Sequence, residues 1–409
     1  MKRVYDVLLN DILVGHLQEG DDSKIAFRMH DDYRSLPGRP VLSQSFEDDL
    51  SKTYRGKGNQ LPAFFANLTP EGKLRDIIER SLRLTHPDEL GLLESVGHDL
   101  PGAVIITPSE EALEPFVENG NGGSKPHPPD SEGEELTLRF SLAGVQLKFS
   151  VLRDADKITL PVHGAGGEWI VKLDSPRYPH LPQNEYATLQ WARAAGFEVP
   201  ECHLESVELL DLRLREFAQP DSHVLLIQRY DRTATTRIHQ EDFAQVVNQV
   251  PDLKYDHVKY EQCAALVLRV AGTDQYFEFI RRLVFVVASG NSDAHLKNWS
   301  FIYPDGIHPI LSPLYDQVSV IAWPEFAAEL SLKLAGVKHL KKIDKDAFAR
   351  LAKKAGANIE QTLETVSETL GRIHDAWQNT LNVKQLFPSS HAEALEKYWK
   401  QSQLMKAFA

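Results

Sequence analysis

Alternating apolar and polar positions mark the start of the chain. They predict a strand over Val4–Leu9 and, after a turn at Asn10 and Asp11, a second strand over residues 13–17. A helical pattern follows around residues 74–84, and a further strand is predicted at residues 103–106. These elements indicate an N-terminal unit of mixed structure that spans residues 1–117.

A segment rich in glycine, proline and acidic residues follows this unit. Residues 118–135 contain almost nothing apolar to bury, and such a composition is typical of a flexible linker. We therefore expect residues 118–135 to separate the N-terminal unit from the rest of the chain.

Beyond the linker, the pattern changes from strands to helices. Strands are predicted at residues 136–140, 148–152, 169–173 and 224–227, and a helix at 185–195 ends at Gly196. From about residue 241 the period is helical, and an apolar stripe predicts a core-facing helix through Ile359, Leu363, Val366, Leu370, Ile373 and Trp377. Strands before helices predict an α+β protein, with a β-rich part over 136–235 and an all-α lobe over 236–409.

Composition narrows the class of protein. The chain is 42% hydrophobic and 25% charged, which is typical of a globular protein. We expect no membrane partner, because the apolar run at residues 283–288 is too short to span a bilayer and the N-terminus lacks a secretory apolar region. Cys202 and Cys263 form no metal or disulfide pattern, so we expect two buried thiols in a cytoplasmic protein.

The net charge of −13 argues against a broad nucleic-acid-binding face. The densest basic run comprises Lys338, His339, Lys341, Lys342, Lys345, Arg350, Lys353 and Lys354. We favour a solvated helix face over a DNA contact for this run.

Candidate catalytic residues follow the apolar helix predicted over residues 279–288. Gly290 and Asn291 break that helix, so the polar residues after them are expected on a loop. Asp293 and Asn298 in this loop have the spacing of the protein-kinase catalytic loop, in which the Asp accepts the hydroxyl proton and the Asn holds Mg²⁺.

A predicted hairpin places a third oxygen ligand near this loop. Residues 299–303 and 307–311 read as two strands around a turn at residues 304–306. If paired positions sum to about 610, Asp316 returns opposite residue 294. Asp316 and Asn298 are then suited to Mg²⁺, which prefers one or two carboxylates together with phosphate oxygens.

A cation for phosphates is predicted in the β-rich part. Lys172 shares one strand face with Ile170, and Glu185 in the next helix either pairs with this lysine or caps the helix. The small-residue loop at residues 141–148 allows backbone N–H groups to approach phosphate. Residues 224–231 either form a hinge strand that binds adenine, with Tyr230 against the ring, or a plain edge strand.

Taken in order, these motifs resemble those of the HipA family of serine/threonine protein kinases, the toxin half of bacterial toxin–antitoxin pairs. The matching segments are residues 140–148, 170–173, 184–186, 226–232, 239–242, 290–298 and 313–316, and, before the linker, 8–17, 39–45, 65–70 and 97–104. The resemblance covers most of the chain up to about residue 330 and implies a protein-kinase-like bilobal fold.

The resemblance also implies roles for residues. Asp293 would be the catalytic base, Asn298 and Asp316 would hold Mg²⁺, and Ser141 would be the serine that family members autophosphorylate. The residues expected to bind ATP are Ala143, Gly144, Val145, Gln146, Leu147, Lys148, Lys172, Gln228, Arg229, Tyr230, His295, Lys297, Asn298, Tyr315 and Asp316. Phosphorylation of Ser141 would add about two negative charges and displace the phosphate-binding loop.

Partners follow from the same resemblance. The expected protein substrate is an aminoacyl-tRNA synthetase, and the expected partner is a HipB-like helix-turn-helix antitoxin that contacts operator DNA. The chain departs from the family pattern at Gln228 and Tyr230, where an acidic residue and Phe are familiar, at Ser292 and Ala294, and in the linker, where a helix is expected.

Three other functions remain open from the residues alone. A metal hydrolase would use Asp293, His295 and His308, although a zinc site requires more than one well-spaced histidine. A catalytically silent ATP-binding corepressor or scaffold would carry the same residues. A small-molecule kinase would share the Asp293–Asn298 spacing, but the loop around Ser141 and the N-terminal unit count against it.

Overall fold

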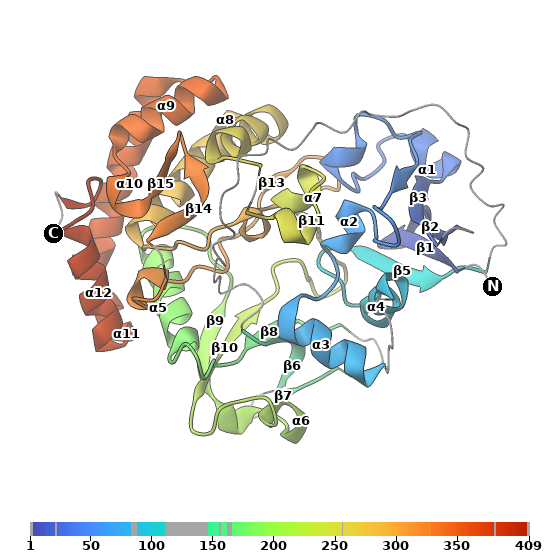
Figure 1. The fold of residues 1–409 in the computed structure, drawn as a ribbon, viewed down its shortest axis with the longest axis horizontal. Helices are drawn as coiled ribbons and strands as arrows, with labels where there is room; N and C mark the ends of the chain where they lie inside the picture. The colour runs from blue at the N-terminus through green and yellow to red at the C-terminus, as the bar shows by residue number, and fades with distance from the viewer. Residues whose placement is uncertain are drawn as a thin grey trace.

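The computed structural model describes residues 3–20, 23–82, 88–110, 146–154, 157–161, 166–255, 257–326, 328–379 and 382–406. The predicted linker at 118–135 and the predicted strand at 136–140 lie outside these residues. Figure 1 shows the N-terminal unit on one side, the helical C-terminal lobe on the other, and a second sheet between and below them.

The N-terminal unit is built on a five-stranded antiparallel sheet with the strand order β4-β3-β2-β1-β5. Its strands are β1 (Val4–Leu9), β2 (Ile12–Glu19), β3 (Ile25–Met29), β4 (Tyr54–Arg55) and β5 (Val104–Pro108). Its helices are α1 (Asp31–Ser35), η1 (Gln44–Phe46), α2 (Ala63–Ala66), α3 (Gly72–Ser81) and α4 (Glu89–Val96). The sheet packs on its own aromatic core, which includes Phe27, Phe46, Phe64 and Phe65. The strands and helix predicted for this unit are confirmed, and β3 and β4 were missed.

The β-rich part that follows is a second antiparallel sheet with the order β7-β6-β8-β10-β9. Its strands are β6 (Lys148–Asp154), β7 (Lys157–Thr159), β8 (Trp169–Lys172), β9 (Cys202–Ser206) and β10 (His223–Gln228). Its helices are α5 (Leu181–Ala194), η2 (Val207–Leu209) and α6 (Leu212–Arg215). Helix α5 begins four residues before its predicted start, because His180 at its N-cap is left-handed and Pro182 suits a first turn.

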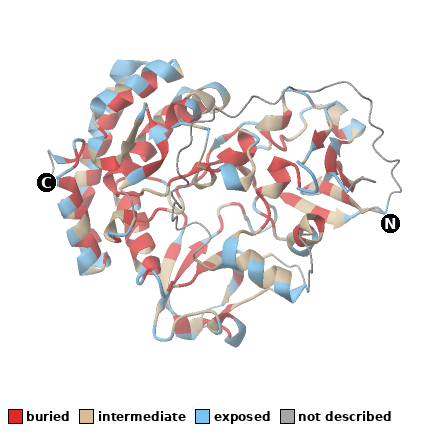
Figure 2. Cartoon of the chain, viewed as in Figure 1, coloured by how far each residue is buried: buried red, intermediate tan, exposed pale blue. Residues whose placement is uncertain are grey.

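The C-terminal lobe is dominated by helices. These are α7 (Phe243–Val246), η3 (Pro251–Leu253), α8 (Tyr260–Ala288), η4 (Leu296–Asn298), η5 (Val320–Ala322), η6 (Leu340–Lys342), α9 (Lys345–Ala355), α10 (Ile359–Asn379), α11 (Val383–Leu386) and α12 (Ser389–Trp399). The stripe predicted for α10 points inward at Val366, Leu370, Ile373 and Trp377, as the buried sides of these helices in Figure 2 illustrate. The α+β class is confirmed.

Two small sheets accompany the helices of this lobe, which the expectation of an all-α lobe did not include. The strands β11 (His239–Asp242), β12 (Ser300–Tyr303) and β13 (Ile310–Leu311) form the first sheet. The strands β14 (Glu329–Leu334) and β15 (Val337–His339) form the second. Strand β11 pairs with β12 because its segment returns beside the catalytic loop, a long-range contact that periodicity does not reveal.

The N-terminal unit is joined to this lobe through a buried carboxyl group. Glu241 on β11 accepts hydrogen bonds from the Ser43 hydroxyl at 2.5 Å and the Gln44 amide at 3.0 Å. The Tyr303 hydroxyl also donates to Glu241. Burial raises the pKa of Glu241 to about 7, although these donors oppose the change. The junction therefore contains a carboxyl group that titrates near neutral pH.

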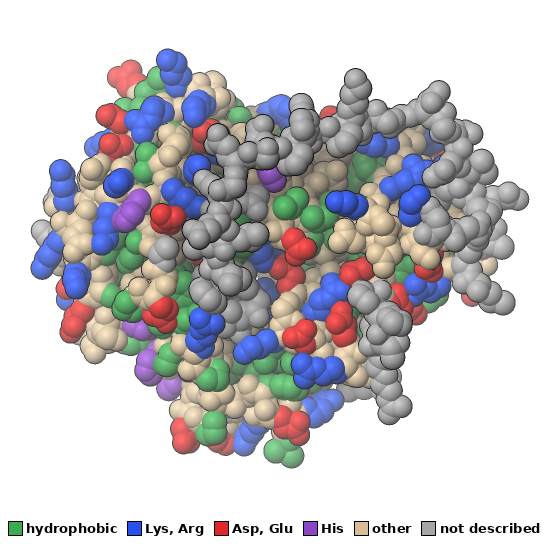
Figure 3. Space-filling view, viewed as in Figure 1, with side chains coloured by type: hydrophobic (Ala, Val, Ile, Leu, Met, Phe, Trp, Pro, Cys, Tyr) green, Lys and Arg blue, Asp and Glu red, His purple; other side chains and the backbone are tan. Residues whose placement is uncertain are grey.

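The two thiols and the α9 part of the basic run behave as expected, whereas Lys338 and His339 lie on strand β15 and are partly buried, so the expected helix face does not cover the whole run. On α9 the side chains of Lys345, Arg350 and Lys353 are exposed, whereas Phe348 and Leu351 are buried. Figure 3 shows basic side chains over the C-terminal helices interspersed with acidic ones. Both cysteines are free and buried. Among the described residues, no helix has the length and apolar character that crossing a bilayer requires.

Candidate active site

A cavity of about 630 Å³ opens where the three parts of the chain meet. The N-terminal unit contributes residues 67–71 and helix α3, and the second sheet contributes Lys148, Ile170 and Lys172. The C-terminal lobe contributes the catalytic loop and Asp316. The cavity therefore brings together most of the residues predicted for ATP and Mg²⁺.

Lys172 is the central cation of this cavity. Its side chain shares a strand face with Ile170, while Val171 on the other face is buried in the sheet core, as alternation predicts. Its ammonium group lies 2.5 Å from Glu185 Oε1 and also bonds Asp316. Although burial acts in the opposite direction, the two carboxylates raise the pKa of Lys172 above its ordinary value. Glu185 is the fifth residue of α5, so the pairing is confirmed and the capping alternative is wrong.

The catalytic loop is fixed by its own backbone and by one tyrosine. Helix α8 ends at Ala288, and Gly290 adopts a φ of +66°, as the predicted break requires. The Asp293 amide donates to Asn291 Oδ1 at 3.1 Å, and the Tyr255 hydroxyl donates to Asp293 Oδ1 at 3.1 Å. Asp293 therefore lines the cavity with one carboxylate oxygen already held in place.

The hairpin after this loop carries Asp316 back to it. Phe301 pairs with Leu311, and Ile302 pairs with Ile310, so paired positions sum to 612 instead of the expected 610. The returning strand begins at Ile310, later than predicted, because Asp305 Oδ1 accepts bonds from the amides of residues 307 and 308 and makes a wider turn. Asp316 nevertheless lines the same cavity as Asn298.

The two residues predicted to hold Mg²⁺ suit this ion chemically. Asn298 donates its amide nitrogen to the Asp293 carbonyl at 3.2 Å, which leaves its amide oxygen for another partner. Although burial opposes the change, the cations Lys172 and Lys148 lower the pKa of Asp316, so it is ionised at neutral pH. Mg²⁺ is typically held by one or two carboxylates together with other oxygen ligands, and Asp316 and Asn298 offer one carboxylate and one amide oxygen in the same cavity.

The small-residue loop is described only at its end. Ser141, Ala143, Gly144 and Val145 lie outside the described residues. Gln146 donates to the Leu173 carbonyl at 3.0 Å, and the Leu147 carbonyl accepts from the Leu173 amide at 2.9 Å. Lys148 on β6 lies directly opposite Lys172 on the neighbouring antiparallel strand β8, and both lysines line the cavity. Two lysines therefore flank Asp316 at this end of the site.

Residues 228–230, the predicted hinge, line the cavity, but their side chains differ in exposure and in what they contact. Gln228 is exposed and lines the cavity. The Tyr230 ring lies 5.7 Å from the Tyr315 ring, between centroids. Arg229 was expected to bind ATP, but its buried guanidinium is ion-paired with Asp99 at 2.6 Å and Asp231 at 2.9 Å. This pairing favours a structural role for the side chain. Its side chain joins the second sheet to the N-terminal unit.

His295 and Lys297 follow Asp293 and face the N-terminal unit. Burial lowers the pKa of His295 to about 3, so its imidazole is neutral. Lys297 Nζ lies 2.9 Å from the Asn67 carbonyl oxygen and 3.0 Å from Glu71 Oε1. Both residues line the cavity, but Lys297 contacts the N-terminal unit rather than the Lys172 carboxylate cluster.

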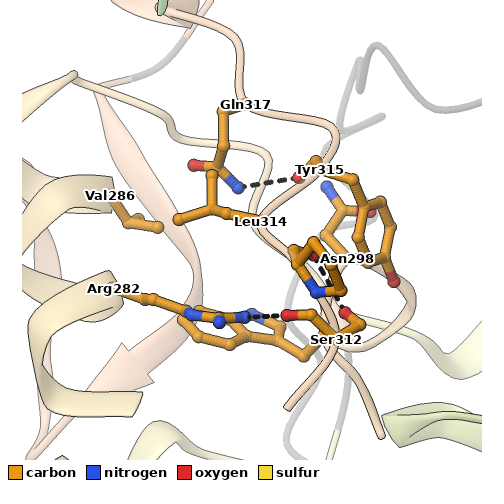
Figure 4. A pocket seen from close by; sticks show the side chains of 9 residues that line it. Arg282, Val286, Asn298, Ser312, Leu314, Tyr315 and Gln317 are labelled. Atoms are coloured by element: carbon orange, nitrogen blue, oxygen red, sulfur yellow. Dashed lines mark hydrogen bonds between the residues drawn. The ribbon is translucent and has the colours of Figure 1, made fainter. Parts of the chain in front are cut away.

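A second, much smaller space of about 10 Å³ lies behind Asn298, comparable with the room for one water. Figure 4 shows Arg282 and Gln317 beside this space, with the Arg282 guanidinium bonded to the Ser312 carbonyl at 2.5 Å and Gln317 to the Tyr315 carbonyl at 3.0 Å. These polar groups fix the backbone at Ser312 and Tyr315, next to Asn298, which lines both spaces.

Some site residues were missed by sequence reasoning. Glu71, Lys254 and Tyr255 line the cavity or contact the catalytic loop, and none carries a local motif that signals this. Asn67 falls in a segment that matched the family pattern, but without an assigned role. Their contacts with the catalytic loop join positions far apart in the chain.

Comparison with known proteins identifies the family. The model of the HipA-like C-terminal domain matches residues 140–377, and the model of the HipA N-terminal domain matches residues 5–107. The chain belongs to the HipA family. This family comprises toxin-type kinases, and both the N-terminal unit and the kinase-like part of the chain fall within its two models.

Relatives of this HipA-family chain include a protein of Sinorhizobium fredii named "Putative kinase Y4dM", which is 38% identical over 386 residues, 92% of this chain and 91% of that protein. The serine/threonine-protein kinase toxin HipA of Shewanella oneidensis is 26% identical over 319 residues, 68% of this chain and 67% of that protein.

A solved structure shares the fold. The Shewanella oneidensis HipA in a complex with HipB and operator DNA has a TM-score of 0.75, with 20% identity over 99% of both chains. This likeness confirms the bilobal kinase-like fold of the HipA-family chain.

The hydrolase alternative finds no support. His308 is exposed and bonded to Asp305 in the hairpin turn, and it does not line the cavity. Within the described parts of the chain, no group of three His, Cys, Asp or Glu side chains is arranged to hold a metal ion. Among the described residues that line the cavity, His295 is the one histidine, whereas a zinc site requires more than one well-spaced histidine.

Proposed function

We propose that this chain is a serine/threonine protein kinase that transfers the γ-phosphoryl group of Mg-ATP to a serine. The observation that carries the proposal is the buried Lys172–Glu185–Asp316 cluster, which faces the Asp293–Asn298 loop across one cavity. A lysine paired with a helix glutamate opposite a catalytic Asp is the arrangement that kinases need.

Each group of residues in the cavity would have its own role in this reaction. Lys172 and Lys148 would bind the phosphate oxygens, and the hinge at residues 228–230 would hold the adenine. Asn298 and Asp316 would hold Mg²⁺, which neutralises charge on the phosphates when it is bound. Asp293, whose carboxylate lines the cavity, would orient the serine hydroxyl.

The proposed step is an in-line displacement. The serine oxygen forms a bond to the γ-phosphorus while the bond from that phosphorus to the bridging oxygen breaks. The leaving ADP keeps the bonding electron pair, and Asp293 accepts the serine proton. The N-terminal unit, which lines one side of the cavity, would limit the access of water to the phosphorus.

We further propose the regulation and partners that the family resemblance implies. Ser141 would be phosphorylated by the chain itself, which would silence the kinase. A HipB-like helix-turn-helix antitoxin would neutralise the toxin and carry it to operator DNA. The solved HipA structure, which contains HipB and operator DNA, supports this choice of partner. The substrate would be an aminoacyl-tRNA synthetase, in the cytoplasm.

The test is incubation of the purified chain with Mg-ATP, beside Asp293→Ala and Ser141→Ala variants, read by intact mass and peptide mapping. We expect one phosphate at Ser141, absent from both variants. ATP binding without transfer would favour a scaffold, and transfer to an aminoglycoside but to no protein would favour a small-molecule kinase. Absence of ATP binding would refute the kinase assignment.

A further inference from the structure

The catalytic loop is held by side chains of the N-terminal unit. Lys297 Nζ lies 2.9 Å from the Asn67 carbonyl oxygen, 3.1 Å from Asn67 Oδ1 and 3.0 Å from Glu71 Oε1. The two hydrogen bonds to Asn67 and the ion pair with Glu71 tie this ammonium group to the N-terminal unit. Lys297 directly precedes Asn298, so the N-terminal unit helps to set the position of the loop.

Glu71 also pairs with a second lysine, Lys254, whose segment contacts the loop that carries Asp293. Its Oε2 atom lies 2.6 Å from Lys254 Nζ. The Lys254 carbonyl accepts a bond from the Leu296 amide at 3.3 Å, and the neighbouring Tyr255 hydroxyl donates to Asp293. The two oxygens of one carboxylate thus hold the two segments that flank the proposed catalytic base.

The charges agree with this geometry. Although burial opposes the change, Lys297 and Lys254 lower the pKa of Glu71 to about 2, so the group is ionised. Glu71 is the N-cap residue of α3, yet its side chain makes no capping bond to that helix. Its carboxylate instead pairs with two lysines of another part of the chain.

We propose that Glu71 is a positioning residue for phosphoryl transfer, so that the N-terminal unit completes the active site. The inference rests on the proposed kinase function. Without Glu71, two ammonium groups would remain beside the catalytic loop, with Asp242 at 3.6 Å from Lys297 as one remaining acidic partner. They would turn towards Asp293 and Asp316 and compete with the serine hydroxyl and Mg²⁺.

The test compares Glu71→Ala and Glu71→Gln with the wild-type chain and with Glu79→Gln. Glu79 is a matched control, because it lies on α3 and pairs only along that helix, at 2.7 Å from Arg75, among its described contacts. The measurements are the maximal rate of self-phosphorylation with Mg-ATP, the ATP concentration at half-maximal rate, and the thermal unfolding temperature.

We expect Glu71→Ala to lower the maximal rate by about tenfold to a hundredfold, as loss of alignment does. The ATP concentration at half-maximal rate should change less than about twofold, because the Lys172 cluster is untouched. Glu71→Gln should recover part of the rate, since its amide oxygen still accepts a bond from one lysine. Glu79→Gln should match the wild-type chain.

A double variant tests whether Glu71 and Lys254 act through their mutual contact. Lys254→Met should slow the wild-type chain, but in the Glu71→Ala background it should cause no further loss and should recover part of the rate, because it removes one competing ammonium group. A wild-type rate in Glu71→Ala would overturn the inference. So would a parallel fall in rate, ATP affinity and unfolding temperature, because that result indicates a structural role. An inactive wild-type chain would instead refute the proposed kinase function itself.

Discussion

The buried carboxyl group of Glu241 makes the stability of this chain depend on pH in a way that one substitution removes. Glu241 has no exposed surface and accepts bonds from Ser43, Gln44 and Tyr303, which lie on both sides of the junction. Glu241→Gln keeps the shape of the side chain and removes its titration. The difference between the two chains therefore isolates this group.

The magnitude follows from the two pKa values. Burial raises the pKa of Glu241 from 4.5 to about 7 in the folded chain. The folded state binds the extra proton between these values, so the stability it contributes is complete below pH 4.5 and is lost as the pH rises through 7. The full shift corresponds to about 3.4 kcal/mol, of which about 2.5 kcal/mol falls between pH 5 and pH 8.

The assay is urea unfolding followed by tryptophan fluorescence at pH 5, 6, 7 and 8. Relative to Glu241→Gln, the wild-type chain should lose about 2.5 kcal/mol of unfolding free energy from pH 5 to pH 8. Titration of nearby His239, whose pKa burial lowers to about 4, occurs in both chains and cancels. Parallel pH profiles would refute the reasoning, because they would mean that Glu241 is ionised throughout.

Other substitutions test the cavity and its surroundings. Lys172→Met should lower the phosphoryl-transfer rate at least about a hundredfold, measured by ADP release, because the phosphates lose their central cation. Gly290→Ala should lower the unfolding free energy by about 1–3 kcal/mol in urea, since φ is +66° and a new Cβ would lie 2.6 Å from Ile321 Cγ2. Arg229→Met should cost about 1–3 kcal/mol by the same measurement, because Asp231 loses this partner while Arg232 still pairs with it.

Local patterns predicted the parts of the site that lie close together in the chain. The five-residue spacing of Asp293 and Asn298 and the hairpin that follows placed Asp316 at the correct end of the cavity, with a pairing error of two positions. A lysine in an apolar strand left open whether Glu185 pairs with it or caps the next helix, and the structure shows the pair. These predictions succeeded because strand alternation and hairpin closure are set by neighbouring residues.

Contacts between distant segments could not be predicted in this way. Lys297 was expected at the phosphates, but Asn67, 230 positions earlier, binds its ammonium group. Arg229 was expected at the adenine hinge, but its side chain is committed to Asp99 and Asp231. In both cases the residue type, a lysine or an arginine, shows that the side chain will bond carboxylates or carbonyls. Which partner it bonds depends on how the N-terminal unit packs against the rest of the chain, and local sequence does not reveal this.

The docking contacts of the N-terminal unit fall at functionally distinct places. One set surrounds Glu241 on β11, another joins Asp99 to Arg229 beside the hinge, and a third joins Glu71 to Lys254 and Lys297 at the catalytic loop. Buried and partly buried charge pairs of this kind are costly to separate, since each leaves a charge without its partner. A displacement of the N-terminal unit would therefore loosen residues 228–230 and the Asp293–Asn298 loop together. If these segments bind ATP and catalyse phosphoryl transfer as proposed, a partner that binds the N-terminal unit in a displaced position would act on both steps at once.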